Sequence, residues 1–94
     1  MTFEWDAKKA ARNFRKHGVS FEEAHTVLND PLAHIFIDEL HTSDERREII
    51  IGHSVRGHLL LVCFAERFND VVRIYSARRA TPAEQTDYEE NATA

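Results

Sequence analysis

A cluster of arginines near the end of the chain carries the strongest chemical signal in this sequence. Residues 73–81 read RIYSARRAT and hold Arg73, Arg78 and Arg79 together with Tyr75, without an acidic residue among them, although the whole chain has a formal net charge of −4. Guanidinium groups present planar pairs of N–H donors that match phosphate and carboxylate oxygens. We therefore predict that the cluster meets either an anionic ligand, with a phosphate backbone as the leading candidate, or a structural carboxylate.

Strand periodicity divides these side chains between two faces. Residues 71–78 are rich in Val and Ile and predict a strand, in which alternate side chains point to opposite faces. Arg73 and Tyr75 then share one face, and Arg79 joins them if the strand extends that far. Arg78 has the opposite parity, so it reaches the same pocket only where the backbone turns toward the next helix.

The first predicted helix adds a second basic surface. Lys9, Arg12 and Lys16 follow one another at three- and four-residue spacing, with His17 beside them. The ordinary explanation of such a face is a solvated helix surface. Arg78 has a structural alternative as well, because an acid such as Glu84 or Glu22 can hold it in an ion pair.

Composition excludes several other classes of protein. The six histidines show no metal-ligand spacing, so we expect no metal centre and no cofactor. Cys63 is the single cysteine and lies in an apolar stretch, which predicts a core position and a reducing compartment. No apolar run is long enough for a membrane span, and the N-terminus lacks a signal-peptide core. We expect one cytoplasmic domain over residues 1–94.

The order of expected elements favours an α+β fold: a small antiparallel sheet with two N-terminal helices and one C-terminal helix, the helices packed on one face. The expected strands and helices are a strand at 2–5, helices at 7–17 and 21–28, strands near 34–38, 47–53, 58–67 and 71–78, and a helix from 82 to about 90. We expect Asp6 to cap the first helix, whose apolar stripe comprises Ala7, Ala10, Ala11 and Phe14. Capping boxes at Ser20–Glu23 and Thr81–Glu84 begin the other two helices. Turns at 56–57 and 69–70 connect the last three strands.

Several segments together resemble the BrnT family of toxins from type II toxin–antitoxin systems. The residues that carry the resemblance are FEWD at 3–6, KHGVSFEEA at 16–24, Asp30-Pro31, Arg47 with Gly52, Glu66-Arg67, and SARRAT at 76–81 followed by Glu84 and Tyr88. The resemblance covers residues 3 to about 90 in the same order. It implies a RelE-like fold and a ribonuclease that blocks translation. It also implies a BrnA-like ribbon-helix-helix antitoxin, through which alone the toxin meets operator DNA.

Metal-free RNA cleavage needs a deprotonated ribose 2′-hydroxyl, a stabilised phosphorane and a protonated leaving oxygen. We assign transition-state stabilisation to Arg78 and Arg79. Tyr75 or His17 moves protons or stacks on a base, and Glu66 is a candidate general base. The residues expected to position the RNA backbone are Lys9, Arg12, Lys16, Arg47 and Arg73.

The chain departs from the family pattern at three places. Phe64 stands where many relatives carry a histidine, Ala7 replaces a frequent proline, and the final helix has no basic residue in TPAEQTDYEE. A helix without cations attracts RNA less strongly. These departures motivate an alternative function, that of a catalytically weakened or inactive relative that binds its antitoxin and helps it to repress DNA.

Overall fold

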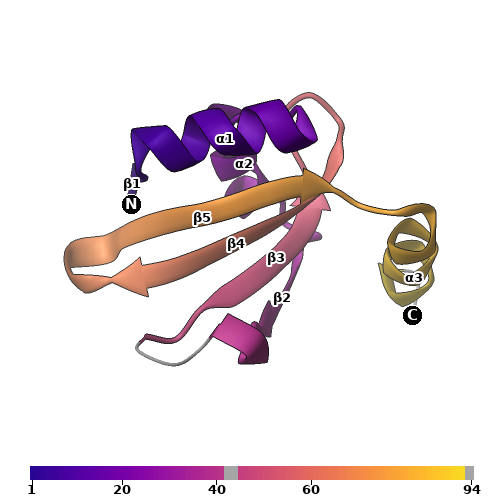
Figure 1. Ribbon diagram of the computed structural model, residues 1–94. Helices are drawn as coiled ribbons and strands as arrows, with labels where there is room; N and C mark the ends of the chain where they lie inside the picture. Colours follow the sequence, from indigo (N-terminus) through magenta and orange to yellow (C-terminus); the bar gives the residue numbers. More distant parts are fainter. Residues whose placement is uncertain (42–44, 93–94) are drawn as a thin grey trace.

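The chain folds into one five-stranded sheet with helices packed around it (Figure 1). The computed structural model describes residues 1–41 and 45–92. Its elements, with η marking short 3₁₀ segments, are β1 (Thr2–Glu4), α1 (Ala7–His17), α2 (Phe21–Ala24), η1 (His25–Asn29), β2 (His34–Ile37), η2 (Glu39–His41), β3 (Glu48–His53), β4 (Leu59–Arg67), η3 (Phe68–Asp70), β5 (Val71–Arg79) and α3 (Pro82–Ala92).

The strands pair in the order β1-β5-β4-β3-β2. β1 runs parallel to β5, and every other pair is antiparallel. Asn69 and Asp70 both have positive φ, 62° and 61°, in the three-residue connection between the paired residues Arg67 and Val71. The expected α+β class and the strand series are confirmed.

Side-chain caps begin the helices at the predicted residues. Asp6 caps α1, and the Ser20 hydroxyl accepts the Glu23 N–H at 3.0 Å. At α3 the capping box is complete, because Thr81 Oγ1 accepts the Glu84 N–H and Glu84 accepts the Thr81 N–H. The expected box at Ser20–Glu23 is only half formed, since the Glu23 carboxylate turns away from it toward other partners.

The second helix is shorter than its sequence pattern predicts. α2 ends at Ala24, and 3₁₀ geometry follows to Asn29, where the sequence predicted one α-helix to residue 28. The Thr26 hydroxyl donates to the Glu23 carbonyl at 2.7 Å, which suits a tightened turn. The segment then packs close to Gly52 of β3, where an added Cβ would lie 2.8 Å from that of Ala33.

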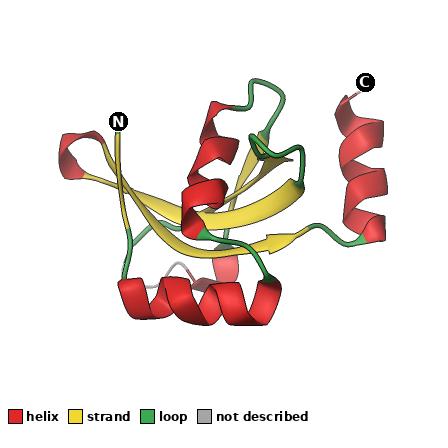
Figure 2. Cartoon of the chain, turned by 90° about the horizontal axis from the view of Figure 1, so that it is seen from above, coloured by secondary structure: helices red, strands yellow, loops and turns green. Residues whose placement is uncertain are grey.

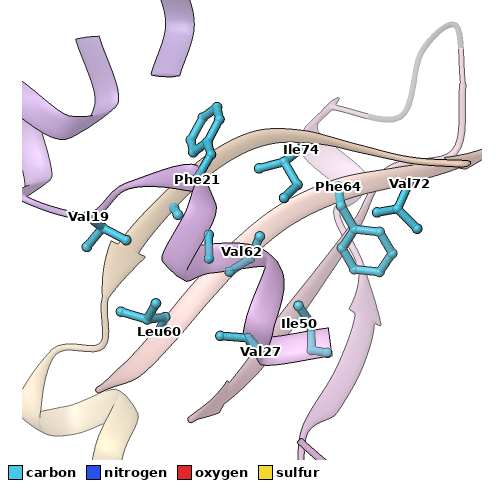
Figure 3. Close-up of a cluster of buried hydrophobic side chains, with 11 residues drawn as sticks. Val19, Phe21, Val27, Ile50, Leu60, Val62, Phe64, Val72 and Ile74 are labelled. Carbon is cyan, nitrogen blue, oxygen red and sulfur yellow. The ribbon is translucent and has the colours of Figure 1, made fainter. Parts of the chain in front are cut away.

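The hydrophobic core lies between α2–η1 and one face of the sheet (Figure 3). Phe21 and Val27 from this segment meet Leu60, Val62 and Phe64 of β4. Phe64 is 1 % exposed. Phe64, one of the three departures from the expected family pattern, is thus a core residue, directed away from the opposite face of the sheet.

α1 packs beside β5 (Figure 2), and a polar residue makes hydrogen bonds between them. The Asn13 amide donates to the Ala77 carbonyl at 2.8 Å and accepts the Ala77 N–H at 3.1 Å, as a neighbouring strand would. The expected apolar stripe is wrong, because Phe14 is 56 % exposed and Asn13 is buried. Hydrogen bonds to the Ala77 N–H and C=O stabilise this packing more than burial of the small, alanine-rich face of α1 would.

The sequence predicted that α3 packs on the core face of the sheet together with the other helices. The structure places α3 on the other face instead. Tyr88 of α3 is buried against the rings of His34 and His53, and its hydroxyl donates to the Leu32 carbonyl at 3.1 Å. By strand alternation these histidines lie on the face opposite the core residue Ile50. α3 therefore covers one part of the second face and leaves the part beside β5 open.

Candidate active site

A β-bulge in β5 decides which side chains reach the open face. Cys63 pairs with Ser76 but Phe64 pairs with Ile74, so Tyr75 is the extra residue. Such an insertion reverses the alternation of side chains beyond it. The sidedness expected from strand parity is therefore wrong beyond Tyr75.

Beyond the bulge, the adjacent residues Arg78 and Arg79 point to opposite faces of the sheet. Ile74 and Ala77 are both 1 % exposed in the core, although simple alternation would separate them. Arg78 consequently faces the open side with Tyr75. Arg79 faces the opposite side, which is the reverse of the sequence expectation.

A groove of about 440 Å³ occupies the open face between α1, β5 and η2. Its polar and charged lining comes from four parts of the chain: Lys9, His17, Asp38, His41, Arg47, Tyr75, Ser76 and Arg78. Five residues predicted from sequence therefore lie in one groove, namely Lys9, His17, Arg47, Tyr75 and Arg78. Lys9 and His17 of α1 reach it because the Asn13 contacts align their helix with β5.

Tyr75 is surrounded by cations. The Arg47 guanidinium carbon lies 3.9 Å from the centre of the Tyr75 ring, the Lys9 ammonium 5.5 Å and the Arg73 guanidinium 5.9 Å. Such groups are attracted to the negative face of an aromatic ring. The Tyr75 hydroxyl donates to Glu45. The ring thus gathers positive charge at one end of the groove.

Arg78 combines a structural ion pair with a place in the groove. Its two terminal nitrogens each donate to a Glu84 carboxylate oxygen at 2.8 Å, and one of them also donates to the Arg79 carbonyl. The hydrogen bonds from Arg78 lower the pKa of Glu84 to about 2. Three of the five guanidinium N–H groups are engaged in this way, and two are left for a ligand.

Asp38, His41 and Cys63 form a second polar group in the groove. His41 Nδ1 donates to Asp38 Oδ2 at 3.0 Å, and the Cys63 thiol donates to the same oxygen at 3.4 Å. Burial, followed by the contact with Asp38, raises the pKa of Cys63 to about 11, so the thiol stays protonated. Burial would raise the pKa of Asp38, but the bonds from His41 and Cys63 outweigh it and lower that pKa.

Sequence reasoning did not find this group and expected Cys63 in the core. Cys63 alternates with the core residues Val62 and Phe64, so strand parity places it on the open face. That signal was present in the sequence. The approach of Asp38 and His41 depends on tertiary contacts, because both follow β2 at the far side of the sheet.

The other predicted site residues lie outside the groove. Glu66 borders a separate depression with Arg67 and Phe68 at the end of β4. Arg12 and Lys16 are exposed on α1 and do not line the groove. Arg73 approaches the Tyr75 ring, but it is engaged by Glu4 at 2.5 Å.

Arg79 belongs to a closed polar network on the core side. Glu23, only 8 % exposed, accepts from Ser54 at 2.7 Å and from His58 Nδ1 at 2.8 Å. The Arg79 guanidinium also contacts His58 Nε2 at 3.1 Å. Burial would raise the pKa of Glu23, but the bonds from Ser54 and His58 lower it overall. Each ring nitrogen of His58 is occupied, which indicates a structural role.

Two features absent from the described residues bear on other classes of function. Within residues 1–41 and 45–92, no group of three or more His, Cys, Asp or Glu side chains is arranged to hold a metal ion. No helix in this part of the chain is long and apolar enough to cross a membrane.

Comparison with known proteins agrees with the fold. The family model described as the ribonuclease toxin BrnT of type II toxin–antitoxin systems matches residues 5–84. A search of curated proteins gives no match. The 1.1 Å crystal structure of the Brucella abortus ribonuclease toxin BrnT is similar, with 25% sequence identity and a TM-score of 0.66, over 86% of this chain and 97% of that chain. This chain therefore belongs to the BrnT family of ribonuclease toxins of type II toxin–antitoxin systems.

Proposed function

We propose that this toxin is an endoribonuclease that cleaves RNA in the Tyr75–Arg78 groove without a metal ion, and that it thereby inhibits translation. One observation carries the proposal. Lys9, Arg47 and Arg78 converge from three parts of the chain on a single groove that also contains two imidazoles. Cations supply the charge that a phosphodiester needs, and imidazoles supply proton transfer near neutral pH.

The proposed reaction is a transfer of the phosphoryl group within the RNA strand. The ribose 2′-oxygen loses its proton and attacks the adjacent phosphorus, and the bond from phosphorus to the 5′-oxygen breaks. The products are a 2′,3′-cyclic phosphate and a 5′-hydroxyl, which receives a proton. Arg78 and Lys9 stabilise the negative charge that builds up on the phosphoryl oxygens in the transition state.

Two histidines are the proposed proton carriers. His41 donates through Nδ1 to Asp38, which leaves the lone pair on Nε2 of the neutral ring as a base. His17 is the second imidazole of the groove and serves as the acid. Tyr75 has its hydroxyl engaged by Glu45, so its ring is better suited to stacking on a base. Glu66 lies outside the groove and has no place in this mechanism.

The proposed partner is a BrnA-like antitoxin with a ribbon-helix-helix domain. Membership of a type II toxin family implies a cognate antitoxin. In this proposal the toxin touches operator DNA only through the antitoxin and acts in the cytoplasm.

A cleavage assay in the presence of a chelator tests the activity. We expect the purified chain, at sub-stoichiometric concentration, to fragment total RNA in excess EDTA and to leave 2′,3′-cyclic phosphate ends. Loss of cleavage in EDTA that returns with Mg²⁺ would contradict metal independence. Fragments with 3′-hydroxyl ends would contradict attack by the 2′-oxygen.

A second candidate function is that of an inactive, antitoxin-binding co-repressor. The pairing of Arg78 with Glu84 favours it, because a carboxylate already occupies the site proposed for phosphate. The absence of any RNA cleavage, together with tighter operator binding by the antitoxin when the toxin is present, would support this candidate over a nuclease.

A further inference from the structure

The outer strand of the sheet is apolar and exposed. β2 is the last strand of the sheet in the part of the chain that the structure describes, as Figure 1 shows. Its residues Ile35, Phe36 and Ile37 are 55 %, 47 % and 46 % exposed. Natural proteins usually protect a sheet edge with charges, proline or a bulge. None of these devices is present in the four residues of β2.

The register of β2 shows which backbone groups remain available. The Asp38 N–H donates to the Arg47 carbonyl at 2.9 Å, next to the antiparallel pair Ile37–Glu48. Bonded and non-bonded pairs alternate in an antiparallel ladder, so the N–H and C=O groups of Ile35 and Ile37 point away from β3. The backbone groups of β5 that point away from β4 are not available in this way, because β1 and the Asn13 amide bond to them.

A second groove lies beside this edge. It has a volume of about 310 Å³ and is bounded by His34 and Phe36 of β2, by Ile51 and Leu61, and by the acidic face of α3. Beyond the two ends of β2, Leu32 and Leu40 are 67 % and 91 % exposed. An apolar patch of this kind, continuous with an open sheet edge, is typical of an interaction surface.

Charge distinguishes among possible occupants of this surface. Glu39 lies just beyond the end of β2, and α3 contributes four further acids, Glu84, Asp87, Glu89 and Glu90, without a basic residue. RNA is repelled here, unlike in the Tyr75–Arg78 groove. A second copy of the chain would bring two acidic surfaces together, which disfavours self-association. A positively charged, apolar peptide segment fits both the charge and the open edge.

We propose that β2 and α3 form the docking surface for the cognate antitoxin, which adds an extended segment as a sixth strand along β2. The segment carries alternating apolar side chains that cover Ile35, Phe36 and Ile37, together with Lys or Arg residues that face Glu39 and Asp87. Main-chain bonds at Ile35 and Ile37 hold it in register. The proposal rests on the toxin–antitoxin role described above, but not on RNA cleavage.

Hydrogen exchange locates the docking surface directly. The probe is the antitoxin encoded next to the gene for this toxin, co-expressed with the Arg78→Ala variant so that toxicity does not limit the yield. We expect the amides of Ile35 and Ile37 to become protected in the complex and to exchange freely in the toxin alone. Protection confined to α1 and the Tyr75–Arg78 groove would overturn the proposal. Protection of β2 in the toxin alone that grows with concentration would identify a second copy as the occupant and overturn it too.

A matched pair of variants separates the backbone from the side chain. Ile35→Pro removes one outward N–H and leaves the β2–β3 ladder intact, whereas Ile35→Ala removes the side chain and keeps that donor. We expect the proline variant to bind the antitoxin at least about tenfold more weakly than the alanine variant. Equal affinity of the two would contradict strand addition.

A charge reversal tests the same surface without disturbing the strand. Glu39 and Asp87 are exposed, so the Glu39→Lys/Asp87→Lys double variant should fold normally. We expect antitoxin affinity to fall about tenfold or more while RNA cleavage is retained. Unchanged affinity in a folded double variant would overturn the proposed charge complementarity. A toxin that binds in this way but cleaves no RNA would contradict the nuclease and leave the docking surface standing.

Discussion

Arg78 and Arg79 are neighbours in the sequence, but they belong to two regions of different character. Arg78 lies in an open groove that Lys9 and Arg47 also line, and two of its guanidinium N–H groups are left for a ligand. Arg79 ends a chain of hydrogen bonds through His58 to the buried Glu23, in which both ring nitrogens of His58 are occupied. The comparison shows that residue type alone does not identify a functional site. A site is identified by hydrogen-bond donors that face a groove and remain available to a ligand.

The largest expected effect concerns the two arginines themselves. Arg78→Ala should lower the rate of RNA cleavage by on the order of 100-fold, because it removes a donor to the transition-state phosphoryl group. Arg79→Ala should change that rate by less than about threefold. Single-turnover cleavage of a defined RNA measures both, with circular dichroism as the control for folding. Equal losses in two folded variants would contradict the distinction between the regions.

The next effect concerns the stability of the closed network. Glu23→Gln should lower the free energy of unfolding by about 2 kcal/mol, because Ser54 and His58 lose a charged acceptor in a buried site. Cleavage by the folded fraction should not change. Urea unfolding at several pH values gives the measurement.

The pH dependence of that loss is also determined by the lowered pKa. Since the pKa of Glu23 is below its ordinary value of 4.5 when folded, its contribution is complete above that pH and is lost as the pH falls below it. A stability difference between the parent and Glu23→Gln that persisted unchanged into strong acid would contradict the ionised network.

A smaller effect is expected at the ion pair that borders the groove. Glu84→Gln should destabilise the fold by about 1 kcal/mol after allowance for solvent screening, since both partners are partly exposed. The pKa of Glu84 is depressed from 4.5 to about 2, so this contribution is present above pH 4.5 and disappears as the pH falls toward 2. The variant should also bind RNA more tightly, because Arg78 no longer faces a competing carboxylate. Weaker RNA binding would mean that Glu84 is needed to orient Arg78.

The smallest effect separates the groove from the outer surface of α1. Lys9→Ala should reduce the slope of log affinity against log salt by about 0.7 for single-stranded RNA, while Lys16→Ala should leave it unchanged. The two variants remove the same charge from the same helix, and only Lys9 lines the groove. Equal slopes would place the RNA on the outer face of α1 instead.

The sequence predicted the residue types of the candidate site, but it predicted only some of the residues that line the groove. Lys9, His17, Arg47, Tyr75 and Arg78 were identified from cation spacing, aromatic position and family resemblance, and they line one groove. Arg79 was not separable from them by strand parity, because the bulge at Tyr75 reverses the alternation in β5. Glu66 lies near the far end of β4 and borders a separate depression. A bulge leaves little local signal, since any residue in an extended strand can occupy it.

Local chemistry determined the features that the sequence predicted correctly. The bounds of α1, the caps at Asp6, Ser20 and Thr81, and the turn at Asn69–Asp70 depend on neighbours within four residues, whose geometry is the same in any fold. The α+β class followed from their order along the chain.

Tertiary structure alone decided the face that α3 covers, the burial of Asn13 and the meeting of Cys63 with Asp38 in the groove. Asn13 is the clearest case. A polar residue on a helix is normally exposed, yet its amide fits the free edge of β5, 64 residues away along the chain, and two backbone groups gain partners there. Such pairings depend on which strand edge remains open once the sheet has assembled, and no local pattern encodes that.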